Sequence, residues 1–290
     1  MDNEHVDEVL TATDPFTSAC LQNQDYDVVL CPDADPRAAT FAAAARAGER
    51  HGLFRNAQGE IEPTGQAAEH WMRMGLSDDL KKANRHTYQV LVAKALDLDP
   101  VRVGEPILEP SDTDTSAAEA FRSDLGFSGP VIGLNTGGGG RWVHKQWTLE
   151  HQQAFLHMAA SAGRGVLLLG GPEEVERHEA LIAGAAGLTV FDSGNHNSLK
   201  RFAAMVQLCT VVVTGDTLAL HVAAARGVPV VVLFGPTSAH EIELYGRGEK
   251  IQPEGLECLV CYLPDCDVTP HCQARITPEM AWRAVERLTS

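Results

Sequence analysis

The sequence predicts an α/β fold with parallel β-sheets, and three observations support this. In the second half of the chain, short apolar runs alternate with helical segments of about 10 to 15 residues, which is typical of a parallel sheet with helices on both faces. The run from Val228 to Phe234 is apolar except at Pro229, as expected for a strand buried on both faces. With 290 residues, 44% of them hydrophobic, the chain is long enough for two domains.

Charge and apolar content limit the partners and the location. A formal charge of −16 at pH 7 argues against nucleic acid as a partner and against electrostatic binding to an anionic membrane. No apolar run approaches the about 20 residues that a transmembrane helix needs. The start, MDNEHVDEVL, is acidic and lacks the basic and apolar parts of a secretion signal. The sequence therefore predicts a cytoplasmic protein.

The first half is expected to form an incomplete domain, residues 1–116 including a linker. Strands are expected at 26–31 and 48–54, with a turn and an Ala-rich helix between them. The segment 71–98 is predicted to form one or two helices broken near Gly75, with Ser77 or Asp78 as the N-cap. The stretch from Pro100 to about Ser116 contains three prolines and is interpreted as the connection between domains.

The second half, residues 117–290, is expected to form a complete parallel sheet. Strands are predicted at 131–135, 165–169, 188–191, 211–213 and 228–234, and helices between them at 147–162, 173–183, 199–208 and 218–225. A last helix is predicted to begin at Thr277-Pro278, with Thr277 as its cap and Pro278 at the first helical position.

The segment 210–237 contains the first candidate site. A strand ends in Thr214-Gly215-Asp216-Thr217 and passes directly into a helix, so unpaired backbone N–H groups point from the carboxyl edge of the sheet toward a crevice. Such an arrangement binds phosphate. A role as helix N-cap alone is an equal alternative for Asp216. His221 is expected near the mouth of the helix, either as a ligand-binding residue or as a buried structural one.

Two further loops leave the same edge of the predicted sheet. Phe234-Gly235-Pro236-Thr237 ends the next strand and offers a hydroxyl and flexible backbone. The loop NTGGGGRWVHKQW at 135–147 combines glycines with positive charge, which favours an anion over the alternative of a flexible loop with a solvated lysine. The candidate ligand-binding residues of this loop are Thr136, Gly137, Gly138, Arg141 and Lys145. Neither a Walker motif nor a dinucleotide fingerprint fits, which disfavours P-loop NTPases and nicotinamide enzymes.

These ordered motifs resemble glycosyltransferase family 9, the lipopolysaccharide heptosyltransferase family. The resemblance covers most of 131–290 and extends more weakly to Tyr26-Asp27. It implies a GT-B fold with two Rossmann-like domains, the acceptor-side one truncated in this chain and the donor-binding one complete. It also implies inverting transfer of heptose from ADP-heptose to a lipopolysaccharide core acceptor without a catalytic metal. The acceptor would bring the protein into peripheral contact with a membrane.

The resemblance also implies roles for single residues. Lys145 would meet the donor diphosphate and stabilise its charge, while Asp216, Thr217 and His221 would lie at the donor phosphates and sugar. The segment from Gly235 through Pro236 to Thr237 would border the same pocket. We expect Asp216 either to cap the helix or to accept from a sugar hydroxyl, because a diphosphate repels a carboxylate.

Two departures from the family pattern bear on activity. Leu218 stands where many members have glycine. The family's opening strand and Ser-x-Gly-Asp turn, whose Asp is its proposed general base, are absent from the sequence, so the general base is unassigned. Either the chain is a truncated reading or activity has been lost, and Asp33 and Asp35 are interpreted as turn residues. The alternatives are a non-catalytic sugar-nucleotide-binding protein and a GT-B transferase with another nucleotide sugar.

Four cysteines form a separate candidate metal site. Cys258, Cys261, Cys266 and Cys272 lie within fifteen residues in the order C-x2-C-x4-C-x5-C. Four such thiols suit a structural zinc ion or an iron–sulfur cluster, although only one Cys-x-x-Cys pair is present. Reduced thiols or a disulfide are the alternatives.

Overall fold

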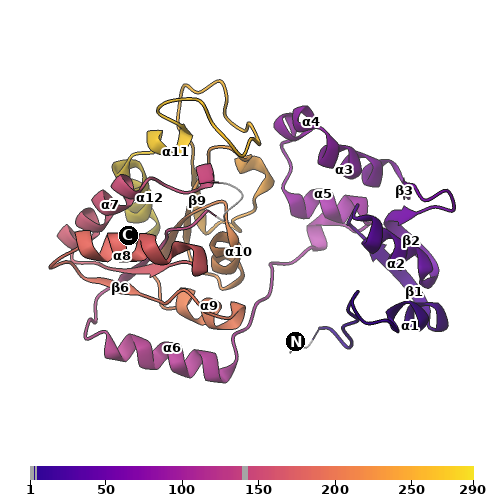
Figure 1. Cartoon of the computed structure of the whole chain (residues 1–290), viewed down its shortest axis with the longest axis horizontal. Helices are drawn as coiled ribbons and strands as arrows, with labels where there is room; N and C mark the ends of the chain where they lie inside the picture. Colours follow the sequence, from indigo (N-terminus) through magenta and orange to yellow (C-terminus); the bar gives the residue numbers. More distant parts are fainter. Residues whose placement is uncertain (1–2, 4, 139–142) are drawn as a thin grey trace. The chain divides into compact units, whose positions relative to one another are not determined.

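The computed structural model describes residues 3, 5–138 and 143–290. It divides into two compact units, Met1–Val103 and Gly104–Ser290 (Figure 1). The predicted boundary lay at 116, inside the second unit. The two units are described separately below.

The first unit contains a three-stranded sheet in the order β1-β2-β3. Its elements are α1 (Thr17–Asn23), β1 (Asp25–Cys31), α2 (Pro36–Ala44), β2 (Arg46–Arg55), β3 (Ile61–Pro63), α3 (Gln66–Leu76), α4 (Asp78–Ala83), α5 (Tyr88–Ala95) and η1 (Pro100–Arg102). Leu53, Ala68 and Ala95 form a small buried core with Trp71 packed against it. The break in the predicted helical segment falls at Ser77, whose hydroxyl accepts from the Leu80 N–H at 3.4 Å and caps α4.

The sheet of the first unit is not wholly parallel, which corrects the prediction. β1 and β2 pair in parallel, but β2 and β3 pair antiparallel. A tight turn causes this reversal: the Asn56 side chain accepts from the N–H groups of Gln58 and Glu60, and Gly59 adopts a positive φ of 88°. This hairpin was not predicted from the sequence.

The second unit contains a six-stranded parallel sheet in the order β6-β5-β4-β7-β8-β9. Numbered from β4, this is the 3-2-1-4-5-6 order of a Rossmann fold. The elements are α6 (Asp112–Asp124), β4 (Val131–Asn135), η2 (Val143–Lys145), α7 (Leu149–Ser161), β5 (Gly165–Leu169), η3 (Pro172–Glu174), α8 (Val175–Gly184), β6 (Val190–Asp192), α9 (Leu199–Val206), β7 (Val211–Gly215), α10 (Leu218–Ala225), β8 (Val230–Leu233), η4 (Ala239–Glu241), β9 (Gly248–Ile251), α11 (Cys272–Arg275) and α12 (Pro278–Thr289).

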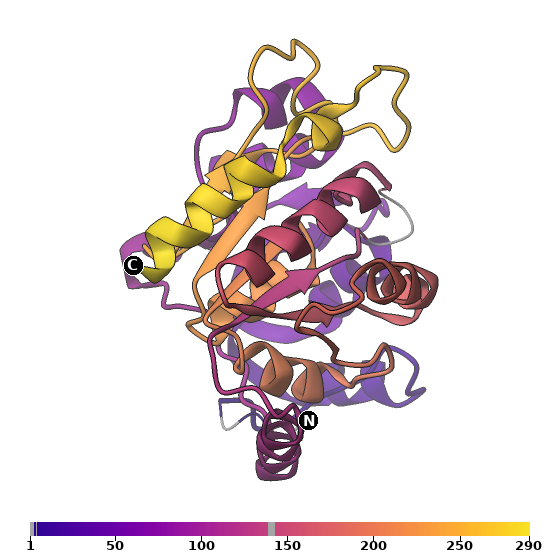
Figure 2. The ribbon, with the colours of Figure 1, turned by 90° about the vertical axis from the view of Figure 1, so that its left-hand side faces the viewer.

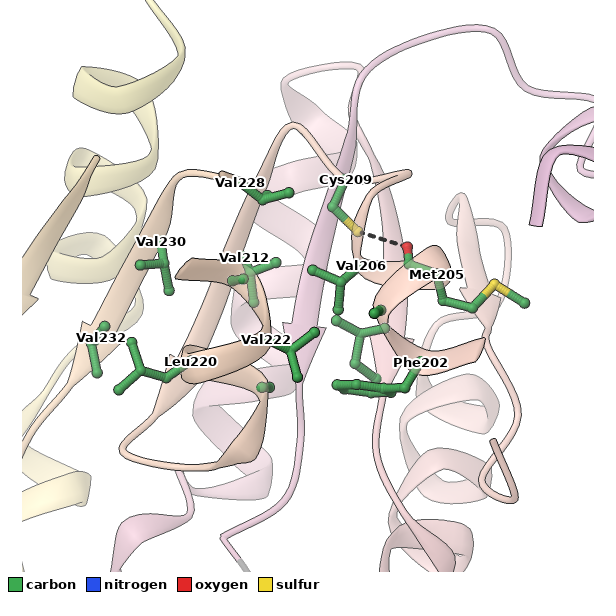
Figure 3. Close-up of a cluster of buried hydrophobic side chains, with 14 of the residues drawn as sticks. Phe202, Met205, Val206, Cys209, Val212, Leu220, Val222, Val228, Val230 and Val232 are labelled. Carbon is green, nitrogen blue, oxygen red and sulfur yellow. Dashed lines mark hydrogen bonds between the residues drawn. The ribbon is translucent and has the colours of Figure 1, made fainter. Parts of the chain in front are cut away.

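Alternate strand residues of this sheet face two separate cores. Val211 and Val213 of β7 belong to the core under α7, α8 and α12, and Figure 2 shows α7 and α12 (yellow) side by side on that face. Val212, between them, belongs to the opposite core with α9 and α10 (Figure 3). Strands that are buried on both faces explain why their apolar runs are nearly continuous in the sequence.

The segment expected to connect the domains is partly helical, because α6 begins at Asp112. The Ser111 hydroxyl caps it by accepting from the Asp114 N–H at 3.1 Å. The Arg201 guanidinium donates to the carbonyls of Asp114 at 2.8 Å and Ala117 at 3.0 Å, which fastens α6 to α9. In the described ranges, no helix combines the length and apolar character needed to cross a bilayer.

Candidate functional site

The carboxyl ends of β4 and β7 form the centre of the candidate site. In the sheet order, successive strands spread to one side from β4 and to the other side from β7, so these two strands form the topological switch point where open α/β sheets bind ligands. Asn135, the last residue of β4, donates from Nδ2 to the Thr217 hydroxyl at 3.2 Å and to the Gly137 carbonyl at 3.1 Å. These bonds join the loop after β4 to the start of α10.

Lys145 and Asp216 form an ion pair beside this junction. Nζ of Lys145 lies 2.8 Å from Oδ2 of Asp216, and the two side chains are only 16% and 15% exposed. The Thr237 hydroxyl donates to the same Oδ2, also at 2.8 Å. Residues that follow three different strands therefore meet at one carboxylate, which holds the lysine ammonium close to the start of α10.

The helix N-cap is Thr217 and not Asp216, so the capping alternative for Asp216 is wrong. The Thr217 hydroxyl accepts from the Ala219 N–H at 3.3 Å and lies 3.0 Å from the Thr214 hydroxyl. Because Thr217 takes the cap, the Asp216 carboxylate is turned toward Lys145. Sequence spacing alone did not distinguish these two neighbours, since both residue types cap helices well.

Gly215 is required by the packing of the chain against itself. A Cβ atom built on Gly215 would lie 2.3 Å from the carbonyl oxygen of Lys145. Glycine therefore lets the η2 segment approach the end of β7 closely enough for Lys145 to reach Asp216.

Thr136 fixes the start of the loop after β4 through buried hydrogen bonds. Its side chain is fully buried, its N–H donates to the Leu169 carbonyl at 3.0 Å, and its own carbonyl accepts from the Gln152 amide at 3.2 Å. Its hydroxyl lies 2.9 Å from a ring nitrogen of His178. The structure thus places the Thr136 side chain behind the loop. The expectation for Arg141 falls on residues outside the described ranges.

A cavity of about 550 Å³ opens at the same edge of the sheet. Of the predicted residues, Gly137, Gly138 and Thr217 line it. The other lining residues come mainly from the ends of β5 and β6 and from the starts of α9 and α10, and they include Gly170, Gly171, Glu174, Asn195, Asn197, Phe202 and Leu218. The lining residues at the ends of β5 and β6 were not predicted, because the loops after these strands have neither the glycine run nor the basic residues that mark the loop at 135–147.

Glu174 is a buried charged group of this cavity wall. It is 8% exposed, and its Oε2 accepts from the Gly171 N–H at 2.8 Å. A Cβ on Gly137 would lie 2.4 Å from Oε1 of Glu174, so the loop after β4 packs directly on this carboxylate. The position of Glu174 shortly after a predicted strand was the sequence signal that could have identified it as a site residue. The direction of its side chain depends on this packing.

His221 is exposed on α10, which excludes the alternative of a buried structural residue. It is the fourth residue of the helix and does not line the 550 Å³ cavity. The His221 side chain is accessible from solvent on the helix that Thr217 caps. The structure does not bring it into contact with Lys145 or Asp216 through any described hydrogen bond.

The turn from Gly235 to Thr237 is held by the cysteine-rich segment. The carbonyls of Gly235 and Pro236 accept from the N–H groups of Val260 at 3.1 Å and Tyr262 at 2.9 Å. A Cβ on Gly235 would lie 2.4 Å from the sulfur of Cys272. Since Thr237 bonds to Asp216, this segment supports the ion pair indirectly.

The four cysteines of this segment are free thiols in the structure. Burial raises the pKa of the Cys272 thiol to about 11, and the neighbouring thiols of Cys258, Cys261 and Cys266 act in the same direction. Within the part of the chain that the structure describes, no three His, Cys, Asp or Glu side chains are grouped to hold a metal ion. The geometry as described does not fit a ready metal site.

Comparison with protein-family models shows the family. The model for glycosyltransferase family 9 (heptosyltransferase) matches residues 16–267, most of the chain. The chain belongs to glycosyltransferase family 9. This confirms the resemblance drawn from the ordered motifs.

Curated proteins similar to this chain are heptosyltransferases. Lipooligosaccharide heptosyltransferase 2 of Haemophilus influenzae is 29% identical over 180 residues, which cover 56% of this chain and 51% of that protein. Lipopolysaccharide heptosyltransferase 1 of Pseudomonas aeruginosa is 29% identical over 133 residues, which cover 46% of this chain and 37% of that protein. The chain spans at most about half the length of these relatives in the matches.

Solved structures of the family share the fold. A family 9 glycosyltransferase from Veillonella parvula matches with a TM-score of 0.65 at 18% identity, covering 91% of this chain and 73% of that one. ADP-heptose heptosyltransferase II of E. coli matches with a TM-score of 0.60 at 20% identity, covering 94% and 79%. These likenesses confirm the predicted α/β fold of GT-B type.

Proposed function

We propose that the chain is an inverting glycosyltransferase that transfers heptose from ADP-heptose to a lipopolysaccharide inner-core acceptor. One observation carries this proposal: the Lys145–Asp216 ion pair lies at the Rossmann switch point, beside the N-terminus of α10. A fixed cation next to unpaired helix N–H groups is suited to a diphosphate. The family and its named heptosyltransferase relatives support the choice of sugar.

The proposed donor pose divides the site into three parts. The 550 Å³ cavity, with its apolar Phe202 and Leu218, takes the nucleoside. The diphosphate lies over the first turn of α10, within reach of Lys145 and the Thr217 N–H. The sugar then extends toward Asp216 and the turn at Gly235–Thr237. His221 approaches the phosphates or sugar from the exposed side of α10.

The chemistry in this pose is charge stabilisation of the leaving group. As the bond from the sugar to the diphosphate breaks, negative charge gathers on the diphosphate oxygens, and a preorganised ammonium lowers the energy of that state. Lys145 supplies the ammonium. Asp216 holds it in place before the donor binds, and in this proposal its second oxygen, Oδ1, accepts from a sugar hydroxyl. An acceptor hydroxyl attacks from the opposite face of the sugar, which inverts the configuration.

The general base is not assigned to any described residue. Asp35 caps α2 by accepting from the N–H groups of Arg37 at 2.8 Å and Ala38 at 3.4 Å, and the Arg37 guanidinium lowers the pKa of its carboxyl group. Asp33 accepts from the Asp35 N–H at 2.8 Å. Both contacts belong to the turn before a helix, so neither residue is proposed as the base.

Calorimetry with ADP, UDP and GDP on the whole chain tests the donor, followed by a transfer assay with ADP-heptose and a deacylated lipopolysaccharide core. We expect ADP to bind at least about ten-fold tighter than UDP or GDP, because binding of the wrong base leaves polar groups unpaired. Binding without transfer would favour the non-catalytic sugar-nucleotide-binding protein. Preference for UDP or GDP would favour a transferase with another nucleotide sugar, and no binding at all would refute the proposal.

A further inference from the structure

His178 on α8 is a buried histidine for which the proposed chemistry has no role. It is 1% exposed, yet both ring nitrogens have polar partners. Nδ1 lies 2.9 Å from Oδ1 of Asp192 at the end of β6, and Nε2 lies 2.9 Å from the Thr136 hydroxyl after β4. A single imidazole thus connects the ends of two strands.

The partners of the ring determine its hydrogen-bond directions. The nearer partner of Nδ1 is the Asp192 carboxylate at 2.9 Å and the farther one is Nδ2 of Asn195 at 3.3 Å; because a carboxylate only accepts, we assign the Nδ1 proton to the bond with Asp192. In that tautomer Nε2 accepts, and we assign the Thr136 hydroxyl proton to it because Nε2 at 2.9 Å is nearer than the other acceptor, the Leu169 carbonyl at 3.5 Å. The same Asp192 oxygen accepts from the Gly194 N–H at 2.9 Å, which carries the connection into the loop after β6.

The order Thr136–His178–Asp192 has the hydrogen-bond pattern of a hydrolase triad, but burial excludes that role. The Thr136 side chain is fully buried, so no substrate carbonyl can reach its hydroxyl. What remains is a structural connection between two loops.

The location of the ring gives this connection a consequence for the cavity. β5 lies between β4 and β6 in the sheet, so the two connected ends are about 10 Å apart. The ring lies under Gly170, where an added Cβ would be 2.8 Å from Nε2. The loop after β4 (residues 136–138) and the loop after β6 (residues 193–197) both contribute lining residues of the cavity, and Asn195 also donates to the Gly171 carbonyl at 3.1 Å.

We propose that His178 is a positioning residue that holds the loops after β4 and β6 in one arrangement and thereby sets the shape and affinity of the nucleotide cavity. The effect on nucleotide affinity rests on the proposed function. The connection between the two loops does not depend on that function, so either can fail without the other.

The connection is tested without ligand by hydrogen exchange on the whole chain. Thr136→Val keeps the volume of the side chain and removes the hydroxyl. We expect it to speed exchange about 5-fold at Gly137 and Gly138 and also at Gly194 across the cavity, since freeing Nε2 loosens the ring that holds Asp192. Faster exchange confined to residues 136–138 would overturn the proposal.

Two conservative substitutions of His178 test its bonds to Asp192 and to Thr136 separately. His178→Asn places an amide near the Nδ1 position and keeps the bond to Asp192, while His178→Gln reaches the Nε2 position and keeps the bond to Thr136. We expect His178→Asn, which loses the same bond as Thr136→Val, to speed exchange at residues 137–138 and also at Gly194, and His178→Gln to speed exchange mainly at residues 193–195. A merely space-filling histidine would give both variants the same pattern, which would overturn the proposal. His157→Gln, at an exposed histidine on α7, is the matched control.

Titration with ADP tests the consequence for affinity. We expect Thr136→Val and His178→Asn each to weaken ADP binding about 5-fold, and the double variant to bind within about two-fold of the weaker single variant, because both break the same bond. Additive losses, or wild-type affinity in variants whose loops exchange faster, would overturn the role in the cavity. If the wild-type chain binds no nucleoside diphosphate, the proposed function fails and so does this role, while the exchange pattern still decides the connection.

Discussion

At the scale of single residues, the Lys145–Asp216 ion pair is the part of the proposed donor site that gives the sharpest test. A diphosphate that reaches Lys145 must share the ammonium with a carboxylate 2.8 Å away. The carboxylate repels the ligand and also orients the cation. Removing the lysine charge should therefore weaken binding of ADP, and removing the aspartate charge should strengthen it.

We predict that Lys145→Ala weakens ADP binding about ten-fold, because hydrogen bonds to charged groups are stronger than neutral ones. Asp216→Asn should bind ADP more tightly than wild type and transfer more slowly, since it removes the repulsion and also a sugar contact. Calorimetry measures ADP binding by both variants, the transfer assay measures the rate of Asp216→Asn, and melting curves show whether both variants are folded. Lys82→Ala, at an exposed lysine of α4, is the control. Unchanged affinity in Lys145→Ala would remove this residue from the site.

His221 gives a second residue-scale prediction. If its imidazole contacts a donor phosphate, the bound diphosphate favours the protonated ring, so donor affinity should fall as pH rises from about 5.5 to about 8.5. His221→Gln can still donate a hydrogen bond but cannot gain charge, so it should flatten this dependence. Because His221 is exposed, the substitution should leave the melting temperature unchanged. An equal dependence of donor affinity on pH in the wild type and in His221→Gln would contradict a ligand-binding role for His221.

At the scale of elements, the turn at Gly235–Thr237 depends on its contact with Cys272. Gly235→Ala places a methyl group 2.4 Å from the Cys272 sulfur, so we predict a loss of about 1–3 kcal/mol in the free energy of unfolding. Gly235→Ala combined with Cys272→Ala should recover part of that loss. Denaturant unfolding measures both. Gly75→Ala, at a helical glycine with open space around it, is the control. Full additivity of the two losses would contradict the contact.

The cysteine segment allows a chemical test of the metal hypothesis. Cys258 is exposed, whereas Cys272 is buried and its pKa is raised from 9.0 to about 11. At neutral pH the thiolate fraction of Cys272 is therefore about 100-fold lower than that of a thiol with the ordinary pKa. We therefore predict that alkylation at pH 7 labels Cys258 well before Cys272. If zinc or iron is bound instead, Cys258 should react only after a chelator is added. Elemental analysis of the same samples separates these outcomes.

The elements also show what the sequence can predict. The strands at 131–135 and 165–169 and the helix at 218–225 were predicted with the observed bounds, because apolar runs buried on both faces leave little choice. β9, with the sequence Gly-Glu-Lys-Ile, was missed because it is an edge strand without an apolar run. α6 was missed because its packing against α9 stabilises a mostly polar segment.

At the scale of the whole molecule, topology explains how much of the site the sequence could predict. Parallel strands end at one edge, so Lys145, Asp216 and Thr237 were expected together, and they lie together. The inward turn of Thr136 and the direction of Glu174 were not expected. The Thr136 side chain depends on its contact with His178 of α8, and Glu174 depends on its contacts with Gly137 and Gly171; spacing along the chain does not contain that information.

The division into two units leads to a prediction for the second unit alone. The ion pair, the described cavity residues and the His178 connection all lie in Gly104–Ser290, which has its own two hydrophobic cores. We therefore expect a fragment with these residues to unfold cooperatively and to bind ADP within about three-fold of the whole chain. It should not transfer heptose, because the resemblance places the acceptor on the other domain. Calorimetry and melting curves on the fragment, with Lys145→Ala in the same fragment as the control, measure this. A folded fragment that binds ADP more than about ten-fold weaker would mean that the nucleotide site is incomplete within Gly104–Ser290.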